Sequence, residues 1–223
     1  MVIDGFVLAG GHGSRMGLDK ARLAWRGQPM AVRVADTLRA RCGRVALVRR
    51  GDDGLPWPGE EVVQEPAHAA RHPLYGVAAA LASARTDLVL VVPCDLPWLT
   101  PGALDALLPG PAVAACAGRV HPLVAVLPRA WAADALALAR AGAPARRLAD
   151  RLVPVELPAS DLRNVNRPED RPGVGPVRGL VDGLPWLGAA ARLRVAKGEQ
   201  RRLAAHGMLD VRYPAAPRTG EVG

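Results

Sequence analysis

The sequence predicts an α/β domain built on a mostly parallel sheet. Three nearly continuous aliphatic runs, residues 2–8, 45–48 and 88–92, are typical of strands that are covered on both faces. Between them lie segments whose apolar residues recur at helical spacing, so strand, loop and helix alternate through the first half of the chain. In such sheets ligands bind at the carboxyl ends of the strands, where the loops after the first and third runs are expected.

Proline and glycine mark most element boundaries in the first half of the chain. Pro29 suits the first turn of a helix over residues 29–41, which ends before Gly43. Asp4 and Gly5 interrupt the otherwise apolar first strand. The other elements expected here are a turn at residues 21–27, a loop over 49–59, a short strand at 62–63 and an alanine-rich helix over 74–84.

The second half of the chain departs from the parallel pattern. The apolar runs at residues 112–116 and 123–127 are separated by Gly118-Arg119, and they predict an antiparallel, hairpin-like pair of strands. The elements expected around this pair are helices over residues 103–108 and 130–141 and a strand over 152–157.

Size and composition favour one globular domain with an appendage. Half of the 223 residues are hydrophobic, yet they include one Phe and two Tyr, so the core is predicted to consist of Ala, Val and Leu. No apolar run reaches the roughly 18 residues that span a bilayer. The first residues also lack the basic and apolar regions of a secretory signal. We therefore expect a cytoplasmic protein without a membrane segment.

Charge and cysteine usage argue against several classes of protein. The formal net charge of +8 comes almost wholly from arginine, and the arginines are scattered without interleaved aromatic residues. This pattern disfavours nucleic-acid binding and favours small phosphate-bearing ligands. Cys42, Cys94 and Cys116 are widely spaced and form no C-x-x-C pair, which argues against a disulfide framework and against a structural zinc site.

The glycine-rich loop after the first strand is the most informative stretch. Its sequence is Leu8-Ala9-Gly10-Gly11-His12-Gly13-Ser14-Arg15-Met16-Gly17-Leu18-Asp19-Lys20. Glycines let the backbone approach a ligand closely, and the N–H groups of such a loop can converge on an anion. Arg15 adds a guanidinium fork and Lys20 a compact charge, so a nucleoside triphosphate is the expected ligand. The alternative is a strand–turn–helix junction that is rich in glycine for packing alone, and the spacing matches neither the Walker A nor the dinucleotide pattern.

A single carboxylate follows the third aliphatic run. Asp95 lies in Pro93-Cys94-Asp95-Leu96-Pro97, between two prolines at the end of a predicted strand. Mg²⁺ usually binds through one or two carboxylates together with substrate phosphates, so Asp95 is the candidate metal ligand. The alternative is that Asp95 caps the following helix, although Thr100 lies closer to the N-cap position.

Three stretches together resemble the molybdenum cofactor guanylyltransferases, which are MobA-like nucleotidyltransferases. The glycine-rich loop matches the family pattern L-A-G-G-x-x-x-R-M-G-x-D-K, residues 93–97 match P-C-D-x-P, and Asn164-Val165-Asn166-Arg167-Pro168-Glu169-Asp170 matches N-x-N-x-P-E-D. The resemblance implies a three-layer α/β/α nucleotidyltransferase fold of the Rossmann-like type over residues 1–170. It leaves residues 171–223 as a basic extension, rich in proline and glycine, that we expect to be partly helical or disordered.

The resemblance also implies an activity and a set of site residues. GMP would pass from GTP to molybdenum-bearing molybdopterin, with release of pyrophosphate and with Mg²⁺ on Asp95. The residues implied in catalysis are Arg15, Lys20 and Asp95. The residues implied in nucleotide binding are Leu8, Ala9, Gly10, Gly11, Lys20, Glu65 and Asp95, and those in acceptor binding are Asn164 and Asn166. Implied protein partners are molybdoenzymes or other proteins of cofactor biosynthesis; neither nucleic acid nor a membrane is expected.

Three positions depart from the family pattern. Glu65 replaces a common Asp, Arg50 stands where an Asn often contacts the nucleotide, and His72 replaces a Gly before Pro73-Leu74-Tyr75-Gly76. Cytidylyltransferase relatives tend to carry L-A-A-G, and the methyl group absent at Gly10 leaves room for a purine, which favours GTP. The alternatives are a cytidylyltransferase acting on the same cofactor, a nucleotidyltransferase with another small acceptor, and a nucleotide-binding protein without catalysis.

Overall fold

The computed structural model describes residues 2–10, 12–13, 18–26, 28–50, 57, 60–65 and 71–166. For residues 12, 13, 18, 19 and 24 it describes only the backbone. The expected C-terminal extension over residues 171–223 lies outside the described residues. Within the described part of the chain, no helix combines the length and the apolar character that crossing a membrane requires.

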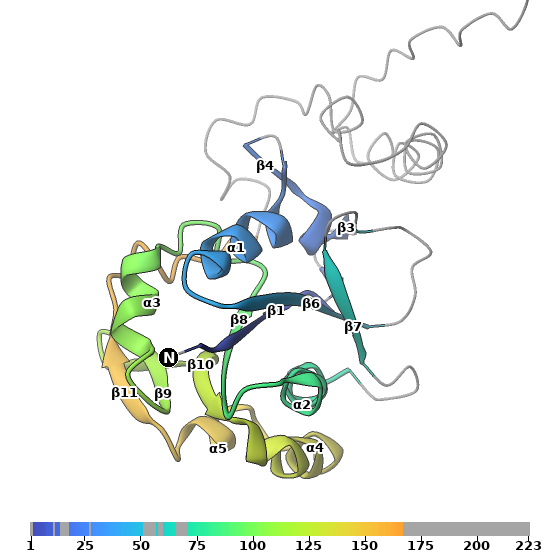
Figure 1. Ribbon diagram of the computed structural model, residues 1–223, viewed down its shortest axis with the longest axis vertical. Helices are drawn as coiled ribbons and strands as arrows, with labels where there is room; N and C mark the ends of the chain where they lie inside the picture. Colours follow the sequence, from blue (N-terminus) through green and yellow to red (C-terminus); the bar gives the residue numbers. More distant parts are fainter. Residues whose placement is uncertain are drawn as a thin grey trace, which may run out of the picture. The chain divides into compact units, whose positions relative to one another are not determined.

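Seven strands of the described chain form the central sheet, in the order β11-β9-β10-β8-β1-β6-β7 (Figure 1). Their bounds are β1 Asp4–Leu8, β6 Arg44–Arg50, β7 Glu61–Glu65, β8 Leu88–Pro93, β9 Ala112–Cys116, β10 Arg119–Pro128 and β11 Val153–Glu156. β1 pairs in parallel with β6 and β8, β6 with β7, and β9 with β11. Of these seven described strands, only β10 runs antiparallel to its neighbours, β8 and β9. The mostly parallel sheet and its antiparallel pair are therefore confirmed.

Two short hairpins connect β1 to the first helix. β2 (His12–Gly13) pairs with β3 (Leu18–Asp19), and β4 (Ala24–Trp25) pairs with β5 (Gln28–Pro29). Between the hairpins lies the 3₁₀ turn η1 (Lys20–Arg22). The first hairpin lies within the glycine-rich loop, and the second hairpin takes the place of the turn expected at residues 21–27.

Helices cover both faces of the sheet. α1 (Met30–Arg39) and α3 (Pro101–Leu107) pack on one face (Figure 1). α2 (Pro73–Ser83), α4 (Ala132–Arg140) and α5 (Arg146–Ala149) pack on the other. In β1, Val7 belongs to the first apolar core and Phe6 to the second, and neither side chain is exposed. A strand buried on both faces explains the continuous aliphatic run, and the three-layer architecture is confirmed.

Several element boundaries differ from the expected ones. α3 begins at Pro101 because Thr100 is the N-cap, with its Oγ1 accepting from the backbone N–H of Ala103 at 3.3 Å. β10 begins at Arg119, before the apolar run expected at residues 123–127. Its pairing register with β9 shifts between Val120 and Ala125, so pairing continues on both sides of the shift. The strand β6 extends to Arg50, so Arg49 and Arg50 belong to the sheet and not to the loop expected over residues 49–59.

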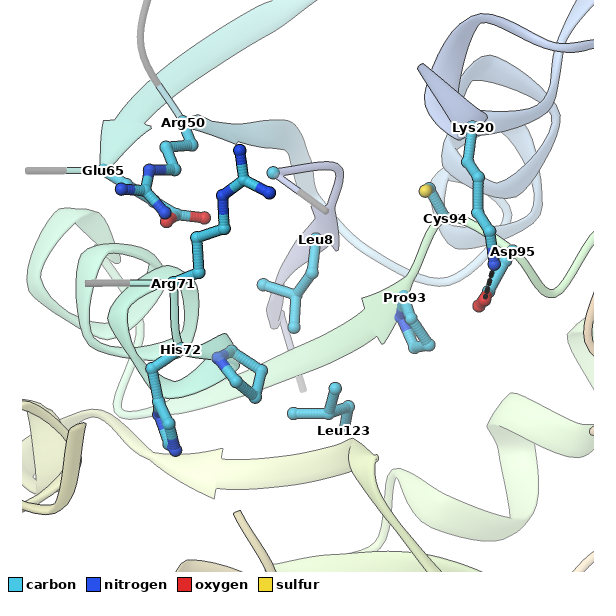
Figure 2. A pocket seen from close by; sticks show the side chains of 12 residues that line it. Leu8, Lys20, Arg50, Glu65, Arg71, His72, Pro93, Cys94, Asp95 and Leu123 are labelled. Atoms are coloured by element: carbon cyan, nitrogen blue, oxygen red, sulfur yellow. Dashed lines mark ion pairs between the residues drawn. The ribbon is translucent and has the colours of Figure 1, made fainter. Parts of the chain in front are cut away.

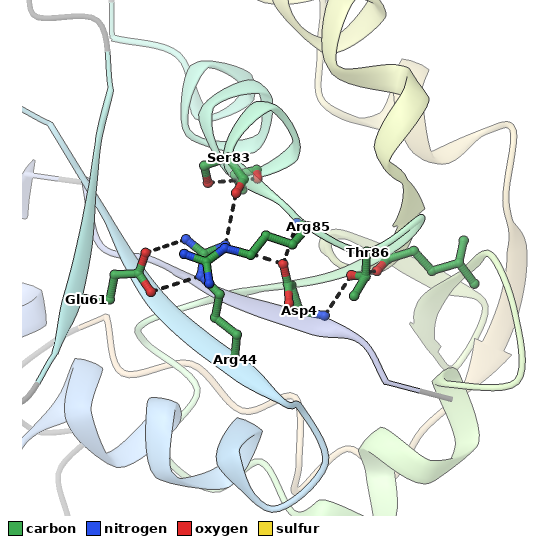
Figure 3. Close-up of polar contacts among 8 residues, drawn as sticks. Asp4, Arg44, Glu61, Ser83, Arg85 and Thr86 are labelled. Carbon is green, nitrogen blue, oxygen red and sulfur yellow. Dashed lines mark hydrogen bonds and ion pairs between the residues drawn. The ribbon is translucent and has the colours of Figure 1, made fainter.

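An ion-pair network fixes β1 at the amino end of the sheet (Figure 3). The Asp4 side chain is buried, and it accepts hydrogen bonds from the backbone N–H of Arg85 at 2.7 Å and from Nη1 of Arg44 at 3.3 Å. Arg44 also donates to the carbonyl oxygen of Ser83 at 3.0 Å and, from Nε, to Glu61 at 2.9 Å. The polar residue that interrupts the first aliphatic run therefore has a structural role.

Replacing Asp4 by alanine is expected to lower the free energy of unfolding by about 3 kcal/mol, because Arg44 then loses one of two carboxylate partners in a mostly buried place. The control is Asp105→Ala, which removes the exposed partner of Arg41 and should leave the free energy of unfolding nearly unchanged. Urea unfolding measures both variants. Equal losses in the two variants contradict the structural role of Asp4.

The cysteines follow the expectation from the sequence. None of Cys42, Cys94 and Cys116 forms a disulfide bond, and the first two are buried. Burial raises the pKa of the Cys42 thiol to about 12, and the nearby Asp4 carboxylate adds to this effect. The Cys42 thiol is therefore neutral at physiological pH and acts as a packing group.

Candidate functional site

Hydrogen bonds fix the backbone of Leu8 and Ala9, where the glycine-rich loop leaves the sheet. The backbone N–H of Ala9 donates to the carbonyl oxygen of Val48 at 2.8 Å, and the N–H of Cys94 donates to that of Leu8 at 3.1 Å. The carbonyl oxygen of Ala9 in turn accepts a hydrogen bond from Nη1 of Arg49 at 2.9 Å. The loop after β1 therefore begins beside the carboxyl ends of β6 and β8, as the parallel topology requires.

Three candidate residues from distant parts of the sequence meet at this edge of the sheet. Nζ of Lys20, the first residue of η1, lies 3.6 Å from Oδ2 of Asp95 in the turn after β8. The same ammonium group donates to Oδ1 of Asn166 at 2.8 Å. The backbone N–H of Val165 donates to the carbonyl oxygen of Asp95 at 2.9 Å, which holds the two segments together. Lys20 therefore bridges the loop after β8 and the last described segment.

The Asp95 carboxylate lies in surroundings that fit a bound cation. Burial raises its pKa, and the Lys20 ammonium acts in the opposite direction. Its Oδ1 atom is buried and has no hydrogen-bond partner among the described residues. Nor do these residues include a group of three or more His, Cys, Asp or Glu side chains able to hold a metal ion by themselves. A cation at Asp95 would thus need oxygens from a ligand, which is how Mg²⁺ binds with phosphates.

A pocket of about 340 Å³ opens along the carboxyl edge of the strands (Figure 2). Lys20 and Asp95 line one end of it. Arg50, Glu65 and Arg71 line the other end, and apolar side chains lie between the two ends. Arg50 and Glu65 are neighbours in the register of β6 and β7. The pocket thus joins a cation–carboxylate pair at one end to a second charged cluster at the other.

The Glu65 carboxylate is lodged between two glycines. A Cβ atom added at Gly10 would lie 2.3 Å from Oε1 of Glu65, and one added at Gly76 would lie 2.8 Å from the same atom. Burial raises the pKa of Glu65, and the positive charges of Arg50 and Arg49 act against this. The space beside Gly10, which the sequence argument assigned to a purine, is occupied by Glu65. The glycine is needed because the carboxylate packs against the loop backbone.

The remaining candidates divide by location. Asn164 is exposed, two residues before Asn166, on the segment that contacts the Asp95 turn. Gly11 and Arg15 lie outside the residues whose side chains the structure describes. His72, which departs from the family pattern, is the N-cap of α2: its Nδ1 accepts from the N–H of Leu74 at 3.3 Å. Its substitution for glycine is thus compatible with the start of this helix.

Two residues that line the pocket, Arg71 and Leu123, were not among the candidates predicted from the sequence. Arg71 precedes the α2 cap, and Leu123 lies in the irregular part of β10 between Val120 and Ala125. Neither stands in a recognisable motif, so only the fold brings them to the pocket. The one available signal was their position: Arg71 precedes the cap of α2, and Leu123 is the first residue of the apolar run expected as a strand at residues 123–127.

Comparison with known proteins identifies the family. The model of the MobA-like NTP transferase domain matches residues 5–157, more than two thirds of the chain. The chain belongs to this family. It is 34% identical over 174 residues to the molybdenum cofactor guanylyltransferase of Ectopseudomonas mendocina (strain ymp), covering 73% of this chain and 87% of that protein. It is 38% identical over 140 residues to the protein of the same name from Acidiphilium cryptum (strain JF-5), covering 58% and 68%.

A solved structure agrees on the fold of this MobA-like chain. The molybdopterin-guanine dinucleotide biosynthesis protein A of Archaeoglobus fulgidus superposes with a TM-score of 0.58 at 20% sequence identity. The superposition covers 75% of this chain and 94% of that one. At this level of identity the likeness concerns the fold, which is the three-layer arrangement described above.

Proposed function

We propose that this chain is a molybdenum cofactor guanylyltransferase, which transfers GMP from GTP to molybdenum-bearing molybdopterin and releases pyrophosphate. Membership of the MobA-like NTP transferase family and the names of the curated relatives support this activity. The observation that carries it is the meeting of Lys20, Asp95 and Asn166 at one edge of the sheet, beside a pocket large enough for a ligand. These residues supply a cation, a carboxylate and an amide where a magnesium triphosphate needs them.

The reaction needs positioning and charge neutralisation more than proton transfer. A phosphate oxygen of the acceptor attacks the α-phosphorus of GTP, and the bond from that phosphorus to the bridging oxygen of the β-phosphate breaks. The nucleophile is already an anion, so no general base is required. Lys20 and the N–H groups of the loop after Ala9 neutralise the triphosphate, and this set of fixed charges is the main catalytic contribution of the chain. Arg15 and Gly11 are proposed members of the same set.

Nucleotidyltransferases generally use a divalent metal, and Mg²⁺ is the proposed ion here. Asp95 is its protein ligand, because the buried Oδ1 lacks a partner among the described residues. When bound, such an ion would supply charge stabilisation to the reacting phosphates. Asp95 is held for this purpose by the N–H of Val165 on its carbonyl oxygen and by Lys20 beside its carboxylate.

Base and acceptor would occupy different parts of the site. Guanine carries two adjacent donors, N1–H and the 2-amino group, and a carboxylate such as Glu65 can accept from both. Leu8, Ala9 and Gly10 bind the nucleotide beside it, where the loop leaves the sheet. Asn164 and Asn166 are proposed to bind the acceptor, because Asn166 lies next to Lys20 and therefore next to the reacting phosphates.

The proposal also includes a location and protein partners. We place the reaction in the cytoplasm and expect molybdoenzymes, or other proteins of cofactor biosynthesis, to receive the product. A pull-down with the product-loaded chain tests the second expectation, because a partner that recognises the product should bind the loaded chain more strongly than the empty one.

The deciding experiment measures pyrophosphate release from each of the four nucleoside triphosphates, with Mg²⁺ and molybdenum-bearing molybdopterin. Release with GTP alone is the expected result. Turnover with CTP but not GTP would replace the guanylyltransferase by a cytidylyltransferase. Turnover only with another phosphate-bearing acceptor would change the acceptor, and nucleotide binding without any pyrophosphate would leave a non-catalytic binding protein.

Replacing Lys20 by alanine is expected to lower GTP-dependent turnover about tenfold or more, because a charge-assisted phosphate contact is lost. Lys20→Arg keeps the charge and should retain part of the activity. The matched control is Arg140→Ala, which removes one positive charge from the exposed face of α4. Steady-state kinetics on the three variants measures the effect. Unchanged kinetics in Lys20→Ala would remove this residue from the site.

A further inference from the structure

Arg49 contacts the beginning of the glycine-rich loop at Ala9. It is a nearly buried arginine, 6% exposed, near the carboxyl end of β6. Its Nη1 donates to the carbonyl oxygen of Ala9 at 2.9 Å, directly before Gly10. Because successive strand residues point to opposite faces, Arg49 and Arg50 are directed to different sides of the sheet. Arg50 lines the pocket, whereas the guanidinium of Arg49 lies 5.2 Å from the centre of the Trp57 ring.

Trp57 also contacts the 3₁₀ turn η1, at the end of the loop. Arg22 is the last residue of η1, the 3₁₀ turn that begins with Lys20. The guanidinium carbon of Arg22 lies 4.2 Å from the centre of the Trp57 ring. Trp57 itself is 9% exposed, belongs to the apolar core on the α1 face, and accepts a backbone hydrogen bond from Glu60 at 3.0 Å. One buried ring therefore contacts an arginine from each side of the loop.

The geometry points to a positioning clamp, in which Arg22, Trp57 and Arg49 fix both ends of the nucleotide-binding loop. This inference rests on the proposed function, because it assigns the clamp to the loop that binds the triphosphate. Glycine has more backbone freedom than any other residue, so ordering the four glycines between residues 10 and 17 around a ligand carries an entropic cost that opposes binding. Fixing Ala9 through Arg49 and the Lys20 turn through Arg22 reduces the freedom before the nucleotide arrives. The three residues act through the loop and touch no reacting atom.

The clamp predicts a defined kinetic pattern. Arg49→Met and Trp57→Leu, in the full-length chain, should each raise the KM for GTP and the Kd of the magnesium nucleotide about tenfold, while kcat changes by less than about threefold. The binding of inosine triphosphate, which lacks the 2-amino group, should be weakened by the same factor as the binding of GTP, because the loop binds the triphosphate and not the base. Arg49→Lys and Trp57→Phe keep a donor and a ring, and they should recover part of the affinity.

The matched control is Arg44→Met, at the opposite end of the same strand (Figure 3). Loss of its ion pairs with Asp4 and Glu61 should lower the melting temperature but leave the KM and Kd unchanged. All assays are run well below the melting temperature of the least stable variant. If Arg44→Met raises the Kd as much as Arg49→Met does, the effect is general destabilisation and the clamp is rejected.

Failure of the clamp and failure of the proposed function give different results. A folded Arg49→Met or Trp57→Leu protein with wild-type Kd for magnesium GTP contradicts the clamp, whatever the wild-type activity is. A wild-type chain that binds magnesium nucleotides without releasing pyrophosphate contradicts the proposed function, and the Kd values of the variants still decide the clamp. A wild-type chain that binds no nucleotide contradicts both.

Discussion

Asp95→Asn should release pyrophosphate from GTP about a hundredfold or more slowly than the wild type. Asparagine keeps the shape of the side chain, so the packing of the turn after β8 is retained. It removes the negative charge that faces Lys20 at 3.6 Å and supplies only a neutral amide in place of Oδ1, which accepts no hydrogen bond from the part of the chain that the structure describes. A neutral amide would hold a divalent ion more weakly than a carboxylate does, so the charge on the phosphates would be less well neutralised.

Three measurements make the Asp95 prediction specific. Pyrophosphate release is followed at saturating GTP over a range of Mg²⁺ concentrations, and the variant should need more Mg²⁺ for any activity it retains. The matched control is Asp105→Asn, which makes the same change to an exposed carboxylate on α3 and should behave as wild type. Circular dichroism confirms that the variant folds. An Asp95→Asn enzyme within about threefold of wild type, at the same Mg²⁺ dependence, would exclude this carboxylate from metal binding.

The fold was predictable wherever one physical signal dominated. β1, β6 and β8 are buried on both faces, so their aliphatic runs identified them directly. β7 is an edge strand whose residues are exposed or half-buried, and only Val62 and Val63 of its five residues are apolar, so the sequence predicted too short a strand. Arg49 and Arg50 indicated a loop because they are polar, and the groups near them in the fold, which include the Trp57 ring and the Glu65 carboxylate, come from other parts of the chain.

The position of Lys20 and Asp95 in the fold was predictable from the sequence, whereas most contacts around the candidate site were not. Lys20 and Asp95 were expected at one edge because both follow strands of a parallel sheet, and they lie there as an ion pair. Asn166 was a candidate only because of the family resemblance, since nothing in the sequence spacing connects it to Lys20, which lies 146 positions earlier. The clamp of Arg22, Trp57 and Arg49 has no signature in the sequence, because its three side chains come from separate parts of the chain. Long-range contacts of this kind depend on the packing of the whole sheet.

Gly10→Ala is expected to lower kcat/KM for GTP about thirtyfold, because the base end of the pocket is rearranged. The backbone at Gly10 has no positive φ, so alanine brings no conformational strain there. Its methyl group, however, would lie 2.3 Å from Oε1 of Glu65 and 3.3 Å from Cβ of Arg50. The carboxylate cannot retreat toward α2, because Gly76 already packs against it on that side. Gly110→Ala, where a Cβ meets nothing within 4 Å, is the control and should leave activity unchanged.

A double variant tests whether this steric conflict is the cause. Shortening Glu65 to aspartate withdraws the carboxylate by about one C–C bond, ~1.5 Å, and so makes room for the alanine methyl group. Gly10→Ala combined with Glu65→Asp should therefore recover kcat/KM to within about fivefold of Glu65→Asp alone, and the two changes should be strongly non-additive. If the two losses simply add, the methyl group acts on the loop or the ligand directly, and Glu65 is not what requires glycine at position 10.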